Sequence, residues 1–129
     1  MRFDGELRST LRLHLERFDR QSVSLDGRRA AAVAVVVVPD AREEADVLLT
    51  VRASGLRRHG GQWSCPGGRC DPGESAEDAA RRELAEEIDL ALPAENVLGL
   101  LDDYPTRSGF VITPVVLWGS GAPLQPDPS

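Results

Sequence analysis

GRCDPGESAEDAARRELAEEIDL, residues 68–90, is the stretch that decides the fold. It joins a turn rich in Gly and Pro to a segment in which Ala80, Leu84 and Ile88 recur every four positions. This spacing predicts an amphipathic helix over residues 75–88, with its apolar side against a core. Ser75 followed by Asp78 is typical of a capping box, with Asp in place of Glu or Gln, so we expect the helix to begin there.

The second half of this helix carries a dense group of acids. Glu83, Glu86 and Glu87 stand at positions i, i+3 and i+4, which directs their carboxylates to one region of the surface. Like charges at that spacing cost about 0.2–0.5 kcal/mol per pair, and anions near a helix C-terminus cost a further ~0.3–1 kcal/mol. A divalent cation among them would reverse the sign of this interaction. The alternative is a solvated acidic face balanced by Arg81 and Arg82, which is the more frequent origin of an isolated charge run.

The loop before the helix favours the metal site over the solvated face. Gly67 and Gly68 precede it, and Gly73 and Glu74 lead directly into the helix. Glycines let backbone carbonyls and amides approach an ion or a phosphate closely. Carboxylates together with a backbone carbonyl suit Mg²⁺, a hard cation that prefers oxygen ligands. The loop and helix therefore have the parts of a Mg²⁺–phosphate site.

The same stretch resembles the Nudix box, whose pattern is G-x5-E-x7-R-E-U-x-E-E-x-G-U with U an apolar residue. Asp89 stands where the family has Gly, and because Asp tolerates a left-handed backbone we expect the box to survive. The remaining fixed positions match in order and spacing: Gly68, Glu74, Arg82, Glu83, Leu84, Glu86, Glu87 and Leu90.

This resemblance implies an α+β fold, an α/β/α Nudix-type sandwich with a mixed sheet, and a pyrophosphohydrolase activity. It implies Mg²⁺ as cofactor, with Mn²⁺ as the other candidate ion, and Glu83, Glu86 and Glu87 as ligands together with the Gly67 carbonyl. Glu74 would shape the site or bind a further metal, and Arg82 would orient the glutamates. The catalytic residues expected from the box are Glu83, Glu86, Glu87 and Arg82.

A second resemblance, upstream, is to the coenzyme A diphosphatase branch, LLTxRSxxxRxxxGxxxFPGG. Residues 48–52, Arg57, Gly61 and residues 66–68 match it, whereas Ala53 and Cys65 depart from it. Residues 101–116 are also similar to that branch. The implied reaction splits coenzyme A into 3′,5′-ADP and 4′-phosphopantetheine.

Three basic residues are expected to contact this substrate. Arg52 and Arg57 are candidates for binding its phosphates, and His59 for lining the cleft. Surface arginines and an exposed loop histidine are equally weighted alternatives. The competing functions are a Nudix pyrophosphatase for another nucleotide, such as ADP-ribose or an oxidised nucleotide, and a nucleotide-binding module without catalysis.

Composition limits the partners and the setting. The chain has 129 residues, which allows a single domain over 1–129, and its net charge of −6 disfavours a nucleic acid partner. The most apolar run, residues 30–39, is too short to span a bilayer, and no leader peptide is evident, so we expect a cytoplasmic protein with a small-molecule nucleotide as partner. Cys65 and Cys70 are expected to be free thiols. Many family members dimerise, so a homodimer is the expected assembly if the chain associates.

The rest of the chain supplies the sandwich. Leucines four residues apart predict a helix over 5–19, and strands are expected at 30–38 (buried on both faces), 46–52, 96–104 and 110–118. Pro114 predicts an edge, bulge or kink in the last strand. Residues 118–129 are rich in Pro and Gly and are expected to form a disordered tail. Related enzymes continue further, so the C-terminal closing elements are expected to be missing.

Overall fold

Strand β1 (Arg29–Pro39) lies in the middle of a mixed sheet and pairs in parallel with β8 (Phe110–Trp118). The computed structural model describes residues 1–51 and 63–119. The six-stranded sheet has the order β2-β1-β8-β6, in which β5 also pairs with β1 and β7 with β8. All of these other pairings are antiparallel. The remaining strands are β2 (Ala45–Val47), β5 (Gly67–Arg69), β6 (Val97–Leu100) and β7 (Tyr104–Pro105), while β3 (Thr50–Val51) and β4 (Trp63–Ser64) form a separate pair.

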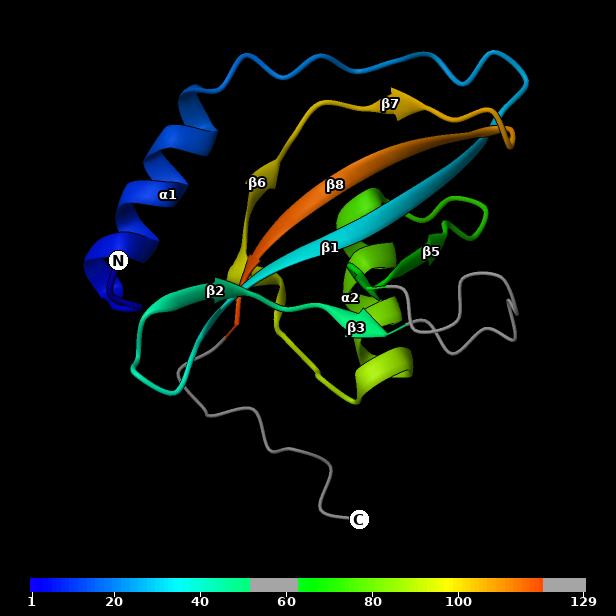
Figure 1. Ribbon diagram of the computed structural model, residues 1–129. Helices are drawn as coiled ribbons and strands as arrows, with labels where there is room; N and C mark the ends of the chain where they lie inside the picture. Colours follow the sequence, from blue (N-terminus) through cyan, green and yellow to red (C-terminus); the bar gives the residue numbers. More distant parts are fainter. Residues whose placement is uncertain (52–62, 120–129) are drawn as a thin grey trace.

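Each face of the sheet packs against one helix (Figure 1). The side chains of Ala32, Ala34 and Val36 on β1 are fully buried and face helix α2 (Ala76–Ile88). The alternate residues Val35 and Val37 are half-buried and face helix α1 (Gly5–Arg17). The predicted α/β/α sandwich is therefore confirmed. The prediction that β1 is buried on both faces is only partly right, because α1 contributes no fully buried residue to its side of the sheet.

Helix α2 begins and ends as its sequence predicts, whereas α1 is shorter than predicted. Ser75 caps α2 by accepting a hydrogen bond from the Asp78 N–H at 3.1 Å. Asp89 ends α2 in the left-handed region with φ 57°, which confirms that Asp takes over the backbone role of the family's glycine. Asp4 caps α1 through the Leu7 N–H at 2.9 Å, and α1 ends two residues before the predicted boundary because Phe18 is extended.

The strand predicted over 46–52 is interrupted. Residues 45–47 pair with β1 and residues 50–51 pair with β4, so the chain leaves the main sheet between them. At the break the Leu48 N–H still donates to the Val36 carbonyl at 2.9 Å, and Leu48 packs against the α2-side core. A continuous apolar pattern thus covers a change of partner strand, which period-2 alternation does not reveal.

The strand predicted over 96–104 is also divided, into β6 and β7, and a 3₁₀ turn (Ala94–Asn96) precedes it. Asp103 lies between β6 and β7 and belongs to neither strand. Its carboxylate accepts hydrogen bonds from the Val23 N–H at 3.0 Å and from the Thr113 hydroxyl at 2.6 Å, and it pairs with Arg20. These contacts attach the segment before β1 to the sheet.

Pro114 occupies a central strand rather than an edge. Its carbonyl accepts from the Leu101 N–H at 3.0 Å, at the point where the partner of β8 changes from β6 to β7. The missing N–H of Pro114 faces this gap in the ladder, because the N–H and C=O of one strand residue point to the same side. The predicted irregularity therefore lies in the neighbouring strand pair.

The first two residues of the predicted tail, Trp118 and Gly119, belong to the folded structure. Trp118 belongs to β8 and is buried, and the Gly119 N–H donates to the Val37 carbonyl at 2.8 Å. The rest of the predicted tail lies outside the described residues. Among the residues that are described, neither α-helix has both the length and the apolar content needed to cross a bilayer.

Candidate active site

The site is built where β5 turns into α2. Gly68 pairs with Ala32 on β1, which places the β5 backbone beside the helix. The chain then turns through Asp71, whose carbonyl accepts from the Glu74 N–H at 2.9 Å. Gly73 has φ +79°, a left-handed conformation that favours glycine in this turn. The turn directs Glu74 back toward the middle of the helix.

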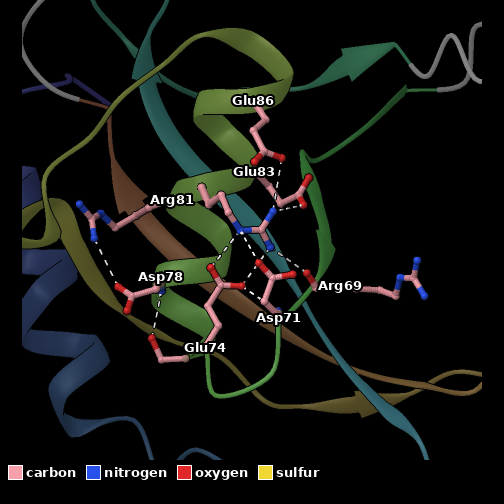
Figure 2. Close-up of polar contacts among 9 residues, drawn as sticks. Arg69, Asp71, Glu74, Asp78, Arg81, Glu83 and Glu86 are labelled. Atoms are coloured by element: carbon pink, nitrogen blue, oxygen red, sulfur yellow. Dashed lines mark hydrogen bonds and ion pairs between the residues drawn. The ribbon is translucent and has the colours of Figure 1, made fainter.

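Arg82 is the centre of a cluster whose acidic members Glu74, Glu83 and Glu86 are labelled in Figure 2. Its Nε and Nη2 donate to the two oxygens of Glu74, each at 2.9 Å, and Nη2 also donates to the Arg69 carbonyl at 3.0 Å. Its Nη1 donates to Glu83 Oε2 at 2.9 Å and to Glu86 Oε1 at 3.3 Å. All five guanidinium N–H groups can therefore be satisfied at once, which a lysine could not do.

The three helix glutamates turn toward β5 and Arg82. Glu83 and Glu86 both accept from Arg82 Nη1, so one guanidinium nitrogen holds both carboxylates. Glu87 accepts a hydrogen bond from the Gly67 N–H at 3.0 Å. The repulsion expected from the sequence is thus offset by one guanidinium and one backbone amide. The Glu83 side chain is only 16% exposed, whereas that of Glu86 is 60% exposed.

Two glycines are required by close packing. A Cβ on Gly68 would lie 2.6 Å from the carboxyl carbon of Glu83, and a Cβ on Gly67 would fall on the carbonyl oxygen of Ala32. Any larger residue at 68 would have to displace Glu83. The absence of a side chain at Gly68 therefore lets the Glu83 carboxylate lie against the β5 backbone, and its absence at Gly67 lets β5 lie close to β1.

These residues fit a hard divalent cation in kind. Every acidic side chain in the group offers oxygen as its ligand atom, and the missing side chain at Gly68 leaves room for a carboxylate beside the backbone. Within residues 1–51 and 63–119, however, no three His, Cys, Asp or Glu side chains converge as a set able to hold an ion. Glu83 and Glu86 are turned to Arg82 instead, so ligation requires them to rotate toward a common point.

The electrostatics of the site come from the Arg82–Glu74 pair. Hydrogen bonds from Arg82 and then from the Asp71 N–H lower the pKa of Glu74 below its ordinary value. Glu74 in turn raises the pKa of Arg82, so the guanidinium stays charged. The site therefore keeps a fixed cation among its acids at all ordinary pH values.

Cys65 and Cys70 flank β5 and are free thiols, as predicted. Burial raises the pKa of the Cys65 thiol. Burial is also the main reason why the pKa of Cys70 is raised, with Glu74 adding to the effect. Both thiols are therefore mostly protonated at neutral pH and are poor nucleophiles.

The described residues bring together most of the predicted site, but not all of it. Arg52, Arg57 and His59 lie outside the described residues, so their substrate-binding role stays a prediction. Gly67 contacts Glu87 through its N–H, and the role of its carbonyl also stays a prediction. Sequence reasoning missed Asp71, whose N–H donates to Glu74 Oε1 at 2.8 Å and whose carboxylate lies 3.6 Å from Arg82 Nε. The D-P-G turn signal before Glu74 was the available clue.

A family model and a solved structure that match this chain carry the same family name. Residues 28–120 match the model of the NUDIX domain family. In the structural comparison, the crystal structure of a Nudix hydrolase from M. smegmatis, RenU, is 30% identical with a TM-score of 0.55, covering 80% of this chain and 68% of that one.

Two curated relatives carry the same name, uncharacterized Nudix hydrolase NudL. The protein from Cronobacter sakazakii is 42% identical over 112 residues, covering 83% of this chain and 57% of the relative. The protein from Yersinia enterocolitica is 38% identical over 113 residues, covering 83% of this chain and 56% of the relative. The chain therefore spans little more than half the length of these curated relatives.

Proposed function

The chain belongs to the Nudix family, and on that premise we propose that it is a divalent-metal-dependent hydrolase of the pyrophosphate bond in a nucleoside diphosphate-linked substrate. The observation that carries this proposal is the cluster around Arg82, in which one cation holds Glu74, Glu83 and Glu86 beside the β5 backbone. An ordinary solvated helix face would not need the space beside Gly68 that Glu83 occupies.

In this proposal each residue of the cluster has a separate task. Glu83, Glu86 and Glu87, together with the Gly67 carbonyl, would hold Mg²⁺ once the glutamates leave their contacts with Arg82 and the Gly67 N–H. Glu74 and Arg82 fix the positions of these acids through a two-point ion pair. When bound, Mg²⁺ would neutralise phosphate oxygens and lower the pKa of the attacking water. The residues themselves contribute position, because Arg82 and the turn before α2 keep the carboxylates beside β5 before substrate arrives.

We further propose that the substrate is coenzyme A or one of its derivatives, cleaved to 3′,5′-ADP and 4′-phosphopantetheine. The support is the branch-like sequence over residues 48–68 and 101–116, which includes Arg52 and Arg57 as phosphate contacts and His59 as a cleft residue. The 101–116 segment contributes β7 and most of β8. This resemblance therefore extends into the main sheet, where β8 pairs with β1.

A substrate panel tests both levels of the proposal. Coenzyme A, ADP-ribose and an oxidised nucleoside triphosphate are incubated with purified protein, with Mg²⁺ or with EDTA, and products are separated by chromatography. We expect Mg²⁺-dependent release of 3′,5′-ADP, and a loss on the order of 10²–10⁴ in rate for Glu87→Gln. Turnover of another member of the panel, but not of coenzyme A, would remove the branch assignment alone.

Absence of turnover with every substrate would remove the enzymatic proposal. A nucleotide-binding module would then remain, and it predicts a rise in Tm on adding nucleotide without any product. Glu77→Gln is the matched control for Glu87→Gln, because it removes an acid from the first turn of the same helix.

A further inference from the structure

The sheet face opposite α2 carries a row of side chains that leads away from the site. Arg69 on β5 pairs with Ala31 on β1, which aligns with Ile112 on β8, which pairs with Tyr104 on β7. Directly paired strand residues point to the same side of a sheet. The four side chains therefore share one face and cross it from the site edge to the β7 edge. Figure 2 shows Arg69 extending away from α2 and from the carboxylates.

This part of the face lies beside the area that α1 occupies. The apolar side of α1 packs on Val35, Val37 and Trp118, toward the other end of β1 and β8. Ala31 and Ile112 are half-buried, and Tyr104 is 45% exposed. Ala31 is also small, so the row is low beside Arg69. The result is an apolar strip with an aromatic ring at one end and a guanidinium at the other.

A second arginine stands at the charged end. Arg29 precedes Ala31 by two residues and is exposed on the same face. Within residues 1–51 and 63–119, the side chains of Arg29 and Arg69 make no hydrogen bond or ion pair. Like charges on diagonal positions of neighbouring strands repel each other. Two unpaired arginines in a chain of net charge −6 are therefore placed to receive an anion.

We propose that this surface, the sheet platform (Arg29, Ala31, Arg69, Tyr104 and Ile112), binds a phosphorylated nucleoside as one half of the substrate. A phosphate monoester lies between Arg29 and Arg69, and the base lies over Ile112 against the Tyr104 ring. Three strand intervals separate Arg69 from Tyr104, about 14 Å, which is a length of nucleotide size. Base–aromatic stacking and guanidinium–phosphate pairing are the matching interactions.

The platform is continuous with the candidate active site. The Arg69 carbonyl accepts the hydrogen bond from Arg82 Nη2 while its side chain lies on the opposite face. One residue thus joins the cluster that handles the diphosphate to the platform that holds the nucleoside. This inference rests on the proposed function and narrows it: substrates with a phosphate beyond the scissile diphosphate are preferred over those without one.

Direct binding tests the platform without turnover. Adenosine 3′,5′-bisphosphate and AMP are titrated by calorimetry into the full chain in EDTA, for wild type, Arg29→Gln and Arg69→Gln. We expect each variant to bind the bisphosphate about tenfold more weakly, since one charge-assisted contact is lost, and AMP with a smaller change. Arg42→Gln, an exposed arginine beyond the opposite end of β1, is the control and should bind as wild type does. An equal loss in Arg42→Gln, or no loss in either platform variant, overturns the proposal.

Steady-state kinetics of turnover is the second test of the platform. The ratio of kcat/KM for coenzyme A over dephospho-coenzyme A should fall about tenfold in Arg69→Gln, and Tyr104→Ala should raise KM for both substrates while Tyr104→Phe restores it. If neither substrate is hydrolysed, the proposed function fails and the calorimetry still decides the platform. If both are hydrolysed with an unchanged ratio, only the platform fails. A shift from dimer to monomer in light scattering, without a change in affinity, would assign this face to a second copy and overturn the proposal.

Discussion

Arg82 and Glu74 form a two-point ion pair in which Nε and Nη2 each donate to a different carboxylate oxygen at 2.9 Å. Glu74 lies just before the N-cap of α2, and Arg82 lies in the middle of the helix, so the pair ties the loop to the helix side. The same guanidinium holds Glu83 and Glu86. Arg82 is therefore a positioning residue, which acts through the acids that it orients.

Arg82→Lys should remove this geometry while keeping the charge. A lysine ammonium cannot donate in parallel to both Glu74 oxygens and also reach Glu83 and the Arg69 carbonyl. We expect kcat to fall on the order of 10²-fold with a smaller change in KM, because the acids lose their orientation rather than their substrate. Steady-state kinetics measures this split. Arg81→Lys, one position earlier on the helix, is the control, and an equal loss there would contradict the assignment.

Gly68→Ala should displace Glu83. The added Cβ would lie 2.6 Å from the Glu83 carboxyl carbon, so the carboxylate has to move away from β5. We expect at least a tenfold loss of activity and a weakened response to Mg²⁺ in thermal melts, since Glu83 is a proposed ligand. Gly5→Ala is a suitable comparison, because a Cβ at Gly5 meets nothing within 4 Å and its φ is ordinary. Full activity in Gly68→Ala would show that the Glu83 position is not needed.

Removing the divalent ion should lower stability as well as activity. Mg²⁺ binds the folded chain only, so Tm should rise with Mg²⁺ concentration and fall to a baseline in EDTA. Glu83→Gln and Glu86→Gln should each reduce this rise, because each removes a charged oxygen ligand. Glu77→Gln on the same helix should leave the rise intact. A Tm independent of Mg²⁺ and Mn²⁺ in wild type would sink the metal assignment.

Asp89→Gly should make the chain more stable. Asp89 has φ 57° and ψ 35°, a left-handed conformation that glycine adopts at lower cost, and its charge lies at the negative end of the helix dipole. Glycine is also more flexible in the unfolded chain, which offsets part of this effect. The net gain in the free energy of unfolding should be about 0.5–1 kcal/mol. Urea unfolding measures it. Asp89→Asn separates the causes, because it removes the charge and keeps the side-chain size, and it should recover only part of the gain.

Features of this site could be predicted from the sequence where the signal is local. The N-cap at Ser75 and the left-handed Asp89 depend on neighbours within one helical turn, and both are confirmed. The pairing of Arg82 with Glu74 joins residues eight positions apart, and only the resemblance to the Nudix box indicated that they belong together. The contribution of Asp71 depends on turn geometry that the sequence signals only as a turn.

Long-range features could not be predicted from residue patterns. The division of the 96–104 strand depends on Asp103 bonding to Val23, which is distant in sequence, and to Thr113 on the next long strand. Pro114 correctly predicts irregular pairing but does not predict where it occurs, because the irregularity lies in the partner strands β6 and β7. Period-2 alternation reports which face a residue occupies and not which strand it pairs with.

Glu74 should make stability depend on acid pH. Because Arg82 and the Asp71 N–H lower its folded pKa below the ordinary value of 4.5, its contribution is present above that value and is lost as pH falls through the lowered pKa. The free energy of unfolding of the metal-free protein should therefore fall as pH decreases below 4.5 and through the lowered pKa, and this part of the fall should vanish in Glu74→Gln. Arg82→Lys should weaken the same dependence, because the arginine is the first cause of the pKa shift. Urea titrations at each pH give the profile, and a Glu74→Gln curve parallel to wild type would show that the pair does not couple protonation to folding.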